Sequence, residues 1–174
     1  MNHLLHLIGR KSSLFILSIS LIWFNGFSQN QEVSEVIAFI SRMAENQGCF
    51  LHKKTISHTY LREYQINFED LNFWNPCKHK LETNNAFLNK EEWETLNSKF
   101  YKLKKQRLPN IRPKDLNKTD STKDETTYIT LPILFRDNSY AVYYSEQGYG
   151  GQINLLKKEH GQWKEYCAYM VWIE

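Results

Sequence analysis

Two cysteine–histidine pairs are the residues in this sequence best suited to chemistry. Cys49 and His52 are three residues apart, and Cys77 and His79 are two apart. Thiolate and imidazole are both zinc ligands, and four of them would complete a tetrahedral structural site. The spacing matches no finger or ribbon pattern, so these four residues are only weak candidates for metal ligands. The sequence predicts no cofactor.

The same residue types allow two further interpretations. Cys49 and Cys77 lie in polar, irregular sequence, so we expect them to form the disulfide of an exported chain, while Cys167 is buried in an apolar strand. Alternatively, Cys77 with His79, or Cys49 with His58, would supply the nucleophile and base of an exported hydrolase. A catalytic thiol also needs a group that orients its base, and the spacing identifies none. We therefore assign no catalytic residue.

Aromatic residues are unusually frequent in the C-terminal part of the chain. They occupy alternating positions in strand-like sequence, so one face of a sheet cannot bury them all. A second aromatic surface would stack sugar rings or hold a protein partner, unless helices or a loop cover it. The residues that we predict to bind a ligand or partner are Tyr143, Tyr144, Tyr149 and Trp163.

A basic stretch runs from Lys99 to Lys118, with eight Lys or Arg residues against Asp115 alone, a local charge of +7. Such a stretch would contact phosphates, acidic glycans or lipopolysaccharide. The alternative is a solvated charge run at the end of a helix, where the helix dipole favours cations. Once Arg10 and Lys11 are removed with the leader described below, 20 basic and 19 acidic residues remain. This balance argues against a nucleic-acid partner.

Two helices are predicted before the strands. Over residues 31–46 the apolar residues recur with helical spacing, and Gly48 follows as a stop signal. Over residues 89–106 Asn89 and Glu92 have the spacing of a capping box. The predicted buried stripes of the two helices are Val33, Val36, Ile37, Ile40 and Met43, and Trp93, Leu96, Phe100 and Leu103.

Four strand-like runs follow, separated by short turn-forming connections. They predict an antiparallel meander with the helices packed on one side of it, and hence an α+β fold. In the last run we expect Trp163, Cys167, Tyr169, Val171 and Ile173 to share one face. The predicted strands are Tyr128–Phe135, Ser139–Ser145, Gln152–Lys158 and Gln162–Ile173.

The N-terminal residues have the features of a secretory signal peptide. Two basic residues precede an apolar run of about 14 residues that ends at small residues near Ser28, too short to cross a bilayer comfortably. We expect residues 1–28 to be removed and residues 29–174 to form one secreted or periplasmic domain, with no transmembrane segment in the mature chain. Residues 117–126 contain no hydrophobic residue and predict a polar loop.

The C-terminal quarter resembles small, exported, uncharacterised proteins of Bacteroidetes. The likeness lies in the segments Pro132–Phe135, Asp137–Ala141, Gly148–Gly151 and Lys157–Lys164, the last with its Gly-x-Trp-Lys hairpin, and in the terminal Trp172-Ile173. A similar hairpin occurs in cone-shaped α+β folds of the nuclear-transport-factor-2 type. The resemblance implies an exported protein of a Gram-negative bacterium and carries no known activity.

These observations predict a non-enzymatic, exported binding domain whose partner is a protein or a glycan. The exported Cys/His hydrolase and an anionic-surface binder acting through residues 99–118 are the alternatives. No nucleic-acid partner is expected.

Overall fold

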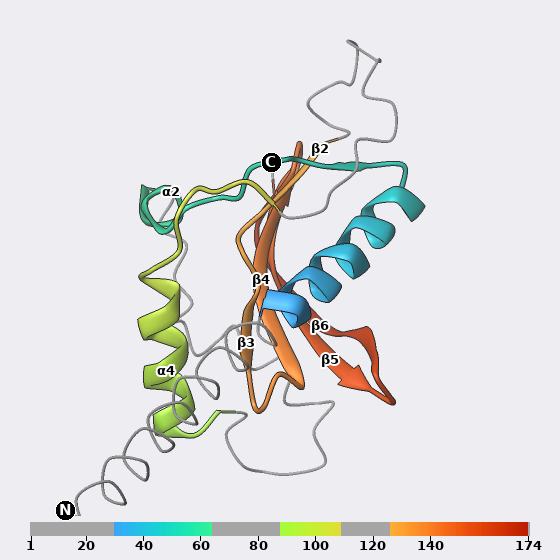
Figure 1. Ribbon diagram of the computed structural model, residues 1–174. Helices are drawn as coiled ribbons and strands as arrows, with labels where there is room; N and C mark the ends of the chain where they lie inside the picture. Colours follow the sequence, from blue (N-terminus) through green and yellow to red (C-terminus); the bar gives the residue numbers. More distant parts are fainter. Residues whose placement is uncertain (1–29, 64–87, 109–125, 174) are drawn as a thin grey trace, which may run out of the picture.

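The computed structural model describes residues 30–63, 88–108 and 126–173, and a mixed six-stranded sheet lies at its centre (Figure 1). The strands follow the order β1-β2-β4-β5-β6, and β3 pairs with β4 beside β2. The strands are β1 (Phe50–Leu51), β2 (Thr126–Ile129), β3 (Ile133–Phe135), β4 (Tyr140–Gln147), β5 (Gly150–Glu159) and β6 (Gln162–Ile173). The helices are the N-terminal helix (residues 30–46), α2 (His58–Glu63) and α4 (Lys90–Phe100).

The prediction of an α+β fold is confirmed, but the four-stranded meander is not. The run predicted as one strand from Tyr128 to Phe135 forms two short strands, β2 and β3, along the same edge of β4. Pro132 lies in the break, and its missing N–H cannot donate to a ladder. Thr130 bridges the break, because its hydroxyl accepts the Tyr144 N–H at 3.0 Å. The sheet becomes mixed because β1, which the sequence did not predict, pairs parallel with β2.

Strands β4, β5 and β6 form two consecutive antiparallel hairpins, and β6 contains two register shifts. Leu155 pairs with Cys167, whereas the next residue of β5 pairs with Glu165, so Tyr166 is an extra residue in β6. An extra residue reverses the face on which later side chains lie. Trp163 and Cys167 therefore belong to different cores, and the prediction that they share a face is wrong.

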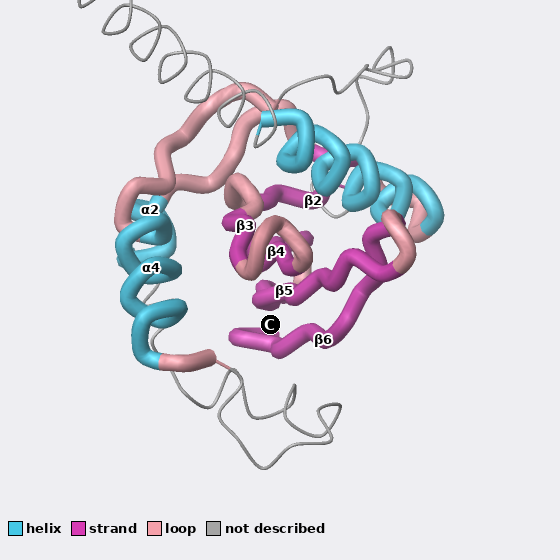
Figure 2. Tube along the Cα trace, turned by 60° about the horizontal axis from the view of Figure 1, so that its bottom comes forward, coloured by secondary structure: helices cyan, strands magenta, loops and turns pink. Residues whose placement is uncertain are grey.

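Both faces of the sheet are covered by helices, which corrects the prediction that all helices pack on one side (Figure 2). The reason is visible in β4, where successive residues 141–145 are all buried. Val142 and Tyr144 contribute to the core under α4 and α2, while Ala141 and Tyr143 contribute to the core under the N-terminal helix. A strand that is apolar on both faces needs a cover on each.

The N-terminal helix matches its prediction within one residue, but α4 ends six residues before the predicted residue 106. Asn89 caps α4, and the predicted capping box with Glu92 is present. After Phe100 the chain turns into an extended segment that pairs with residues 53–56, and Leu103 is buried from that segment. The tertiary hydrogen bonds of this segment therefore end the helix early.

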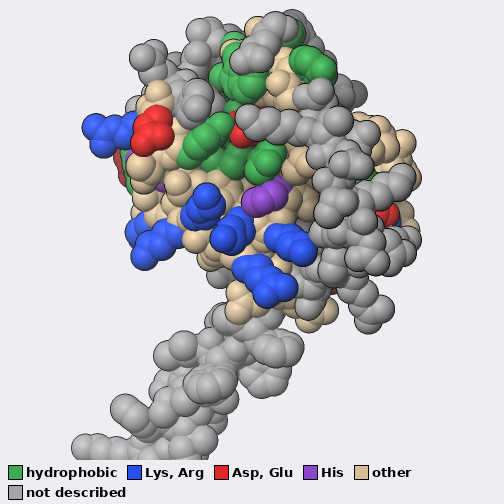
Figure 3. All heavy atoms as spheres, turned by 90° about the horizontal axis from the view of Figure 1, so that it is seen from above, with side chains coloured by type: hydrophobic (Ala, Val, Ile, Leu, Met, Phe, Trp, Pro, Cys, Tyr) green, Lys and Arg blue, Asp and Glu red, His purple; other side chains and the backbone are tan. Residues whose placement is uncertain are grey.

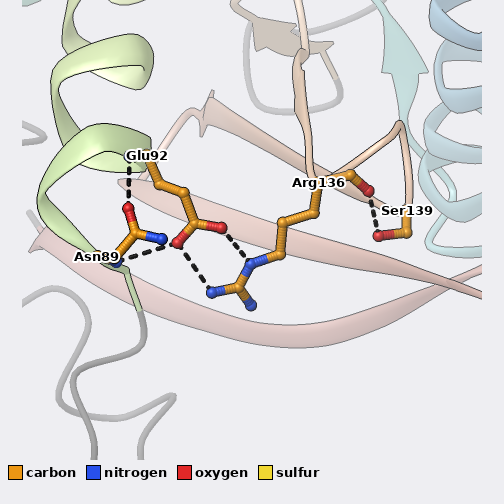
Figure 4. A network of polar contacts seen from close by, with 4 residues as sticks. All are labelled: Asn89, Glu92, Arg136 and Ser139. Carbon is orange, nitrogen blue, oxygen red and sulfur yellow. Dashed lines mark hydrogen bonds and ion pairs between the residues drawn. The ribbon is translucent and has the colours of Figure 1, made fainter.

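Among the described residues, three ion pairs, made by two basic residues, join the helices to the sheet. The Arg136 guanidinium donates two hydrogen bonds to the Glu92 carboxylate, at 2.6 and 3.0 Å, and so connects the start of α4 to the β3–β4 turn (Figure 4). On the other face, Lys158 of β5 contacts Glu32 at 2.6 Å and Glu35 at 3.1 Å in the first turns of the N-terminal helix. These carboxylates raise the pKa of Lys158.

Several predictions fall on residues outside the described ranges. The leader, residues 1–28, is one of them, as is the predicted polar loop apart from Thr126, which begins β2. Among the described helices, none combines the length and the apolar character that a bilayer crossing demands.

Candidate ligand-binding pocket

A pocket of about 500 Å³ lies between the second half of the N-terminal helix and the sheet, at the end where β4 turns into β5. A pocket of this size is in the usual range for small-molecule sites. Its walls combine residues of the helix, β4, β5 and β6. The lining residues are Ile40, Met43, Ala44, Gln47, Thr127, Tyr143, Ser145, Glu146, Gln147, Tyr149, Gly150, Gln152, Asn154, Glu165, Met170 and Ile173.

The helical wall is fixed by the way the N-terminal helix ends. Gly48 has a φ of +77° and follows the last helical turn. Its N–H donates to the Glu45 carbonyl, and the Cys49 N–H donates to the Ala44 carbonyl at 2.9 Å. This is the paired bonding of a Schellman motif, which satisfies carbonyls at the helix end. Ala44 and Gln47 are thereby held at the pocket wall.

Polar side chains form one part of the sheet wall. Ser145 pairs with Gln152 and Tyr143 pairs with Asn154 across β4 and β5, so all four lie on one face of the sheet. The Asn154 amide donates to the Ser145 hydroxyl at 2.8 Å, and the Gln152 amide donates to the Asn154 carbonyl oxygen at 2.9 Å. Asn154 is only 2% exposed, and this network holds its amide in place.

Tyr143 and Glu165 add a phenol and a carboxylate to the pocket. Burial, together with the nearby negative charge of Glu165, raises the pKa of Tyr143 far above neutral pH. The Tyr143 phenol therefore stays protonated and can donate a hydrogen bond. Glu165 is exposed, and neither Lys nor Arg is among the lining residues. The pocket thus favours neutral or cationic ligands over anions.

The pocket rim is apolar and exposed to solvent. Tyr149, in the two-residue turn between β4 and β5, exposes 65% of its surface. Met170 and Ile173 of β6 are 48% and 72% exposed and also line the pocket. Large apolar side chains that remain exposed beside a polar pocket are typical of a contact surface.

The four residues predicted to bind a ligand are separated by the structure. Tyr143 and Tyr149 line the pocket. Tyr144 is fully buried on the opposite face, where its hydroxyl accepts a hydrogen bond from Trp172 and donates one to Glu146. Trp163 is buried against the N-terminal helix, with the Lys158 ammonium 5.6 Å from its ring centre. Tyr144 and Trp163 are therefore core residues, as the covered-surface alternative expected.

The sequence analysis missed the polar part of the pocket. Asn154 carries the clearest signal, because it is a polar residue between the buried Ile153 and Leu155 of β5. A polar residue at an inward position of a strand is a signal of a cavity or a specific network. The helical wall carried no comparable signal, because Ala44 and Gln47 are ordinary helix residues.

Cys49 has a free, buried thiol, so the predicted Cys49–Cys77 disulfide is wrong. The Cys49 thiol donates to the Gln47 carbonyl at 3.6 Å and accepts from the Gln147 amide at 2.7 Å. The Cys49 thiol therefore contacts Gln47 and Gln147 instead of forming the disulfide that we predicted from its polar, irregular surroundings in the sequence. Cys167 is buried in β6, as expected.

The described residues do not bring the cysteine and histidine candidates together. The Nδ1 atom of His52 lies 3.2 Å from the Lys54 nitrogen and 3.0 Å from the Lys54 carbonyl oxygen, and its ring is tilted by 33° against that of Tyr128. The His58 ring packs against Phe100 and Tyr101. Within the described ranges no three His, Cys, Asp or Glu residues gather as metal ligands do. The remaining candidates, Cys77 and His79, lie outside these ranges.

Comparison of the chain with protein-family models, with curated proteins and with solved structures found no match.

Proposed function

We propose that the protein is a non-enzymatic, exported binding domain whose pocket takes a neutral, hydroxyl-rich ligand such as a short glycan. The observation that supports this most directly is the composition of the pocket wall. The Asn154, Gln152 and Ser145 side chains stand beside the protonated Tyr143 phenol in one concave surface. Amides and hydroxyls can donate and accept at once, as the hydroxyl groups of a sugar require.

The rim supports the same ligand class. The exposed ring of Tyr149 can cover the apolar face of a sugar ring while the amides below it hold the hydroxyl groups. The carboxylate of Glu165 in the lining disfavours phosphorylated or sulfated sugars. A small pocket with a few well-placed polar groups is the common design of small-molecule sites.

The proposal of export depends on the signal-peptide pattern and on the resemblance to exported Bacteroidetes proteins. In that setting a soluble glycan or a cell-wall fragment is an available ligand class. The glycan is preferred to a protein partner because the candidate surface is a pocket of limited volume instead of an extended flat face.

The test is binding of the exported chain to a panel of neutral and anionic oligosaccharides, followed by calorimetric titration of the best neutral ligand. We expect Tyr149→Ala and Gln152→Leu each to weaken binding at least tenfold, because one removes a stacking ring and the other a hydrogen-bonding amide. Tyr101→Ala is the matched control, since Tyr101 is also an exposed tyrosine but does not line the pocket.

The outcomes separate clearly. Loss of affinity in both pocket variants with an unchanged control supports the site. Equal affinity in wild type and both pocket variants would place the ligand elsewhere and refute the proposal, as would a panel in which no neutral sugar binds.

A further inference from the structure

Two basic segments that are distant in the sequence lie side by side at one end of the molecule. The Thr55 N–H donates to the Gln106 carbonyl at 2.8 Å, and the Leu108 N–H donates to the Lys53 carbonyl at 2.9 Å. Lys54 and Arg107 are antiparallel bridge partners. Residues 53–56 therefore join residues 104–108 in a short two-stranded ribbon.

The ribbon is held together by main-chain hydrogen bonds and by the buried Thr55 side chain, while its basic side chains are exposed to solvent. Thr55 is 1% exposed, its hydroxyl donates to the Lys104 carbonyl at 3.0 Å, and it accepts the Gln106 N–H at 2.9 Å. The basic residues of the ribbon and its approach are all exposed, and residues 52–58 and 101–108 contain no Asp or Glu. We call this surface the basic face; its residues are Lys53, Lys54, Lys102, Lys104, Lys105 and Arg107.

Figure 3 shows Lys and Arg side chains gathered on the surface seen from above, where these segments run. This gathering of charge is not expected from the helix dipole alone, because Lys53 and Lys54 belong to a different part of the chain from α4. Residues 99–108 of the basic stretch are described, and the ribbon adds the charges of Lys53 and Lys54 from a second segment.

Exposed aromatic residues are close in the sequence to both segments of the basic face. Tyr101, next to Lys102, exposes 55% of its surface, and its ring packs edge-on against His58. Phe50, three residues before Lys53, is 41% exposed. Lysines that attract anionic headgroups, together with aromatic rings that settle at the headgroup level, are the elements of a membrane-surface site.

We propose that the basic face docks the protein onto an anionic lipid surface, independently of the pocket. A bilayer fits better than a discrete ligand, because the six charges spread over an exposed ribbon. Five of the six are lysines, which act as point charges and lack the forked geometry that selects one phosphate. Exposed aromatic rings would be of no use to a purely electrostatic contact with a soluble polyanion.

The test is flotation of the chain, purified after export by a bacterial host, with phosphatidylcholine vesicles that contain no or 30 mol% (about a third) phosphatidylglycerol. We expect binding to the anionic vesicles only, weakening at least tenfold between low salt and roughly 0.3 M NaCl, because exposed charges are screened. A soluble polyphosphate is tested in parallel.

Two charge variants with the same net charge make the comparison specific. Lys54→Gln, Lys105→Gln and Arg107→Gln together remove half of the basic face while retaining the main-chain bonds of the ribbon. Arg42→Gln, Lys90→Gln and Lys164→Gln remove three exposed charges elsewhere. Because each Lys near an anionic bilayer strengthens binding about fivefold, we expect on the order of 100-fold loss in the first variant and less than threefold in the second.

A third variant tests the aromatic contribution. Tyr101→Ala should weaken vesicle binding several-fold without changing its dependence on salt. Thermal unfolding checks that each variant is folded. Equal losses in the two charge variants, absence of binding to anionic vesicles, or binding to polyphosphate but not to vesicles would each overturn the proposal.

Discussion

At the scale of single residues, the Glu92 side chain both caps the start of α4 and pairs with Arg136 of the β3–β4 turn. The Glu92 carboxylate accepts the Asn89 N–H at 3.0 Å in the capping box and also accepts two bonds from Arg136 (Figure 4). Hydrogen bonding to Arg136 lowers the pKa of Glu92. The same guanidinium lies 5.3 Å from the ring centre of Tyr140. The start of α4 is thereby tied to the β3–β4 turn.

Arg136→Gln should lower the free energy of unfolding by about 1 kcal/mol at pH 7, as expected for a partly buried bidentate pair. The folded-state pKa of Glu92 lies below its unfolded value, so the stabilisation is complete above that unfolded pKa and is lost as the pH falls through the folded pKa. Urea unfolding at pH 7 and at about pH 3 measures this. The difference between wild type and variant should shrink at the lower pH.

Lys90→Gln is the control for Arg136→Gln. The Lys90–Glu94 pair is 3.9 Å long, with both side chains largely exposed. Its removal should change the stability by less than about 0.5 kcal/mol. A wild-type advantage that stays constant across the pH range would contradict the assigned role of Glu92.

At the scale of elements, a glycine in β5 leaves room for a side chain of β4 and a side chain of β6 to meet across it. A Cβ atom on Gly151 would collide with the Tyr144 hydroxyl and with the Trp172 indole nitrogen. These two groups are hydrogen-bonded to each other at 3.0 Å. The Tyr144 hydroxyl also donates to the Glu146 carboxylate, which accepts a further hydrogen bond from the Tyr60 hydroxyl of α2. The network crosses from β6 through β4 to a helix, and Gly151 leaves the space for it.

Gly151→Ala should therefore destabilise the protein by about 1–3 kcal/mol, through displacement of a buried hydrogen-bonded pair. Chemical denaturation followed by tryptophan fluorescence measures the change. Gly161→Asn is the matched control, because Gly161 has a φ of +77° and open space around it, and Asn tolerates that conformation. Equal stability of Gly151→Ala and wild type would show that the network is not tightly packed.

Elements with a strong local pattern could be predicted from the sequence, and those fixed by partners could not. The stripe of the N-terminal helix, the capping box at Asn89 and the short turns between the last strands are all present, because adjacent residues determine each of them. Strand β1, by contrast, has two residues and exists only through its pairing with β2.

The candidate site was predicted only in part, for a similar reason. The exposure of Tyr149 could be predicted because an aromatic residue in a tight turn has little to pack against. The role of Tyr143, by contrast, depends on which helix covers its face of the sheet. The extra residue Tyr166 reverses the faces of β6, and alternation in the sequence cannot reveal a bulge. The basic ribbon joins segments about 50 residues apart, and neither segment has a sequence pattern that predicts its pairing with the other.

At the scale of the whole molecule, the pocket and the basic face have opposite electrostatic character. The pocket lining contains the Glu165 carboxylate and no basic residue, while the basic face contains six cations. If both proposals hold, one surface holds the protein at a membrane and the other takes a neutral ligand. The two sets of variants separate them, because Tyr149→Ala should leave vesicle binding unchanged and Tyr101→Ala should leave glycan binding unchanged.

The free thiol of Cys49 leaves Cys77 and Cys167 as the pair available for a disulfide in an oxidising compartment. We expect an intact mass about two units below that of the reduced chain, and non-reducing peptide mapping that links Cys77 to Cys167. Reduction should lower the free energy of unfolding by roughly 2–4 kcal/mol, because the bridge closes a long loop. A Cys49–Cys77 link would contradict this expectation.

The reactivity of Cys49 gives an independent readout. Because its thiol is buried, alkylation in the native state should be slow and should become fast in denaturant. Rapid labelling of Cys49 in the native protein would show that the Schellman end of the N-terminal helix opens readily.

The parallel pairing of β1 with β2 has a consequence for the order of folding. Phe50 pairs with Thr126, so this contact closes a loop of about 75 residues, whereas β4, β5 and β6 are joined by turns of two residues. The C-terminal hairpins should therefore form first, and the N-terminal helix can bury its apolar stripe only afterwards. A chain that leaves the ribosome or crosses a membrane N-terminus first would carry that stripe uncovered until its last 50 or so residues emerge. Such a chain is a natural client for a holding chaperone.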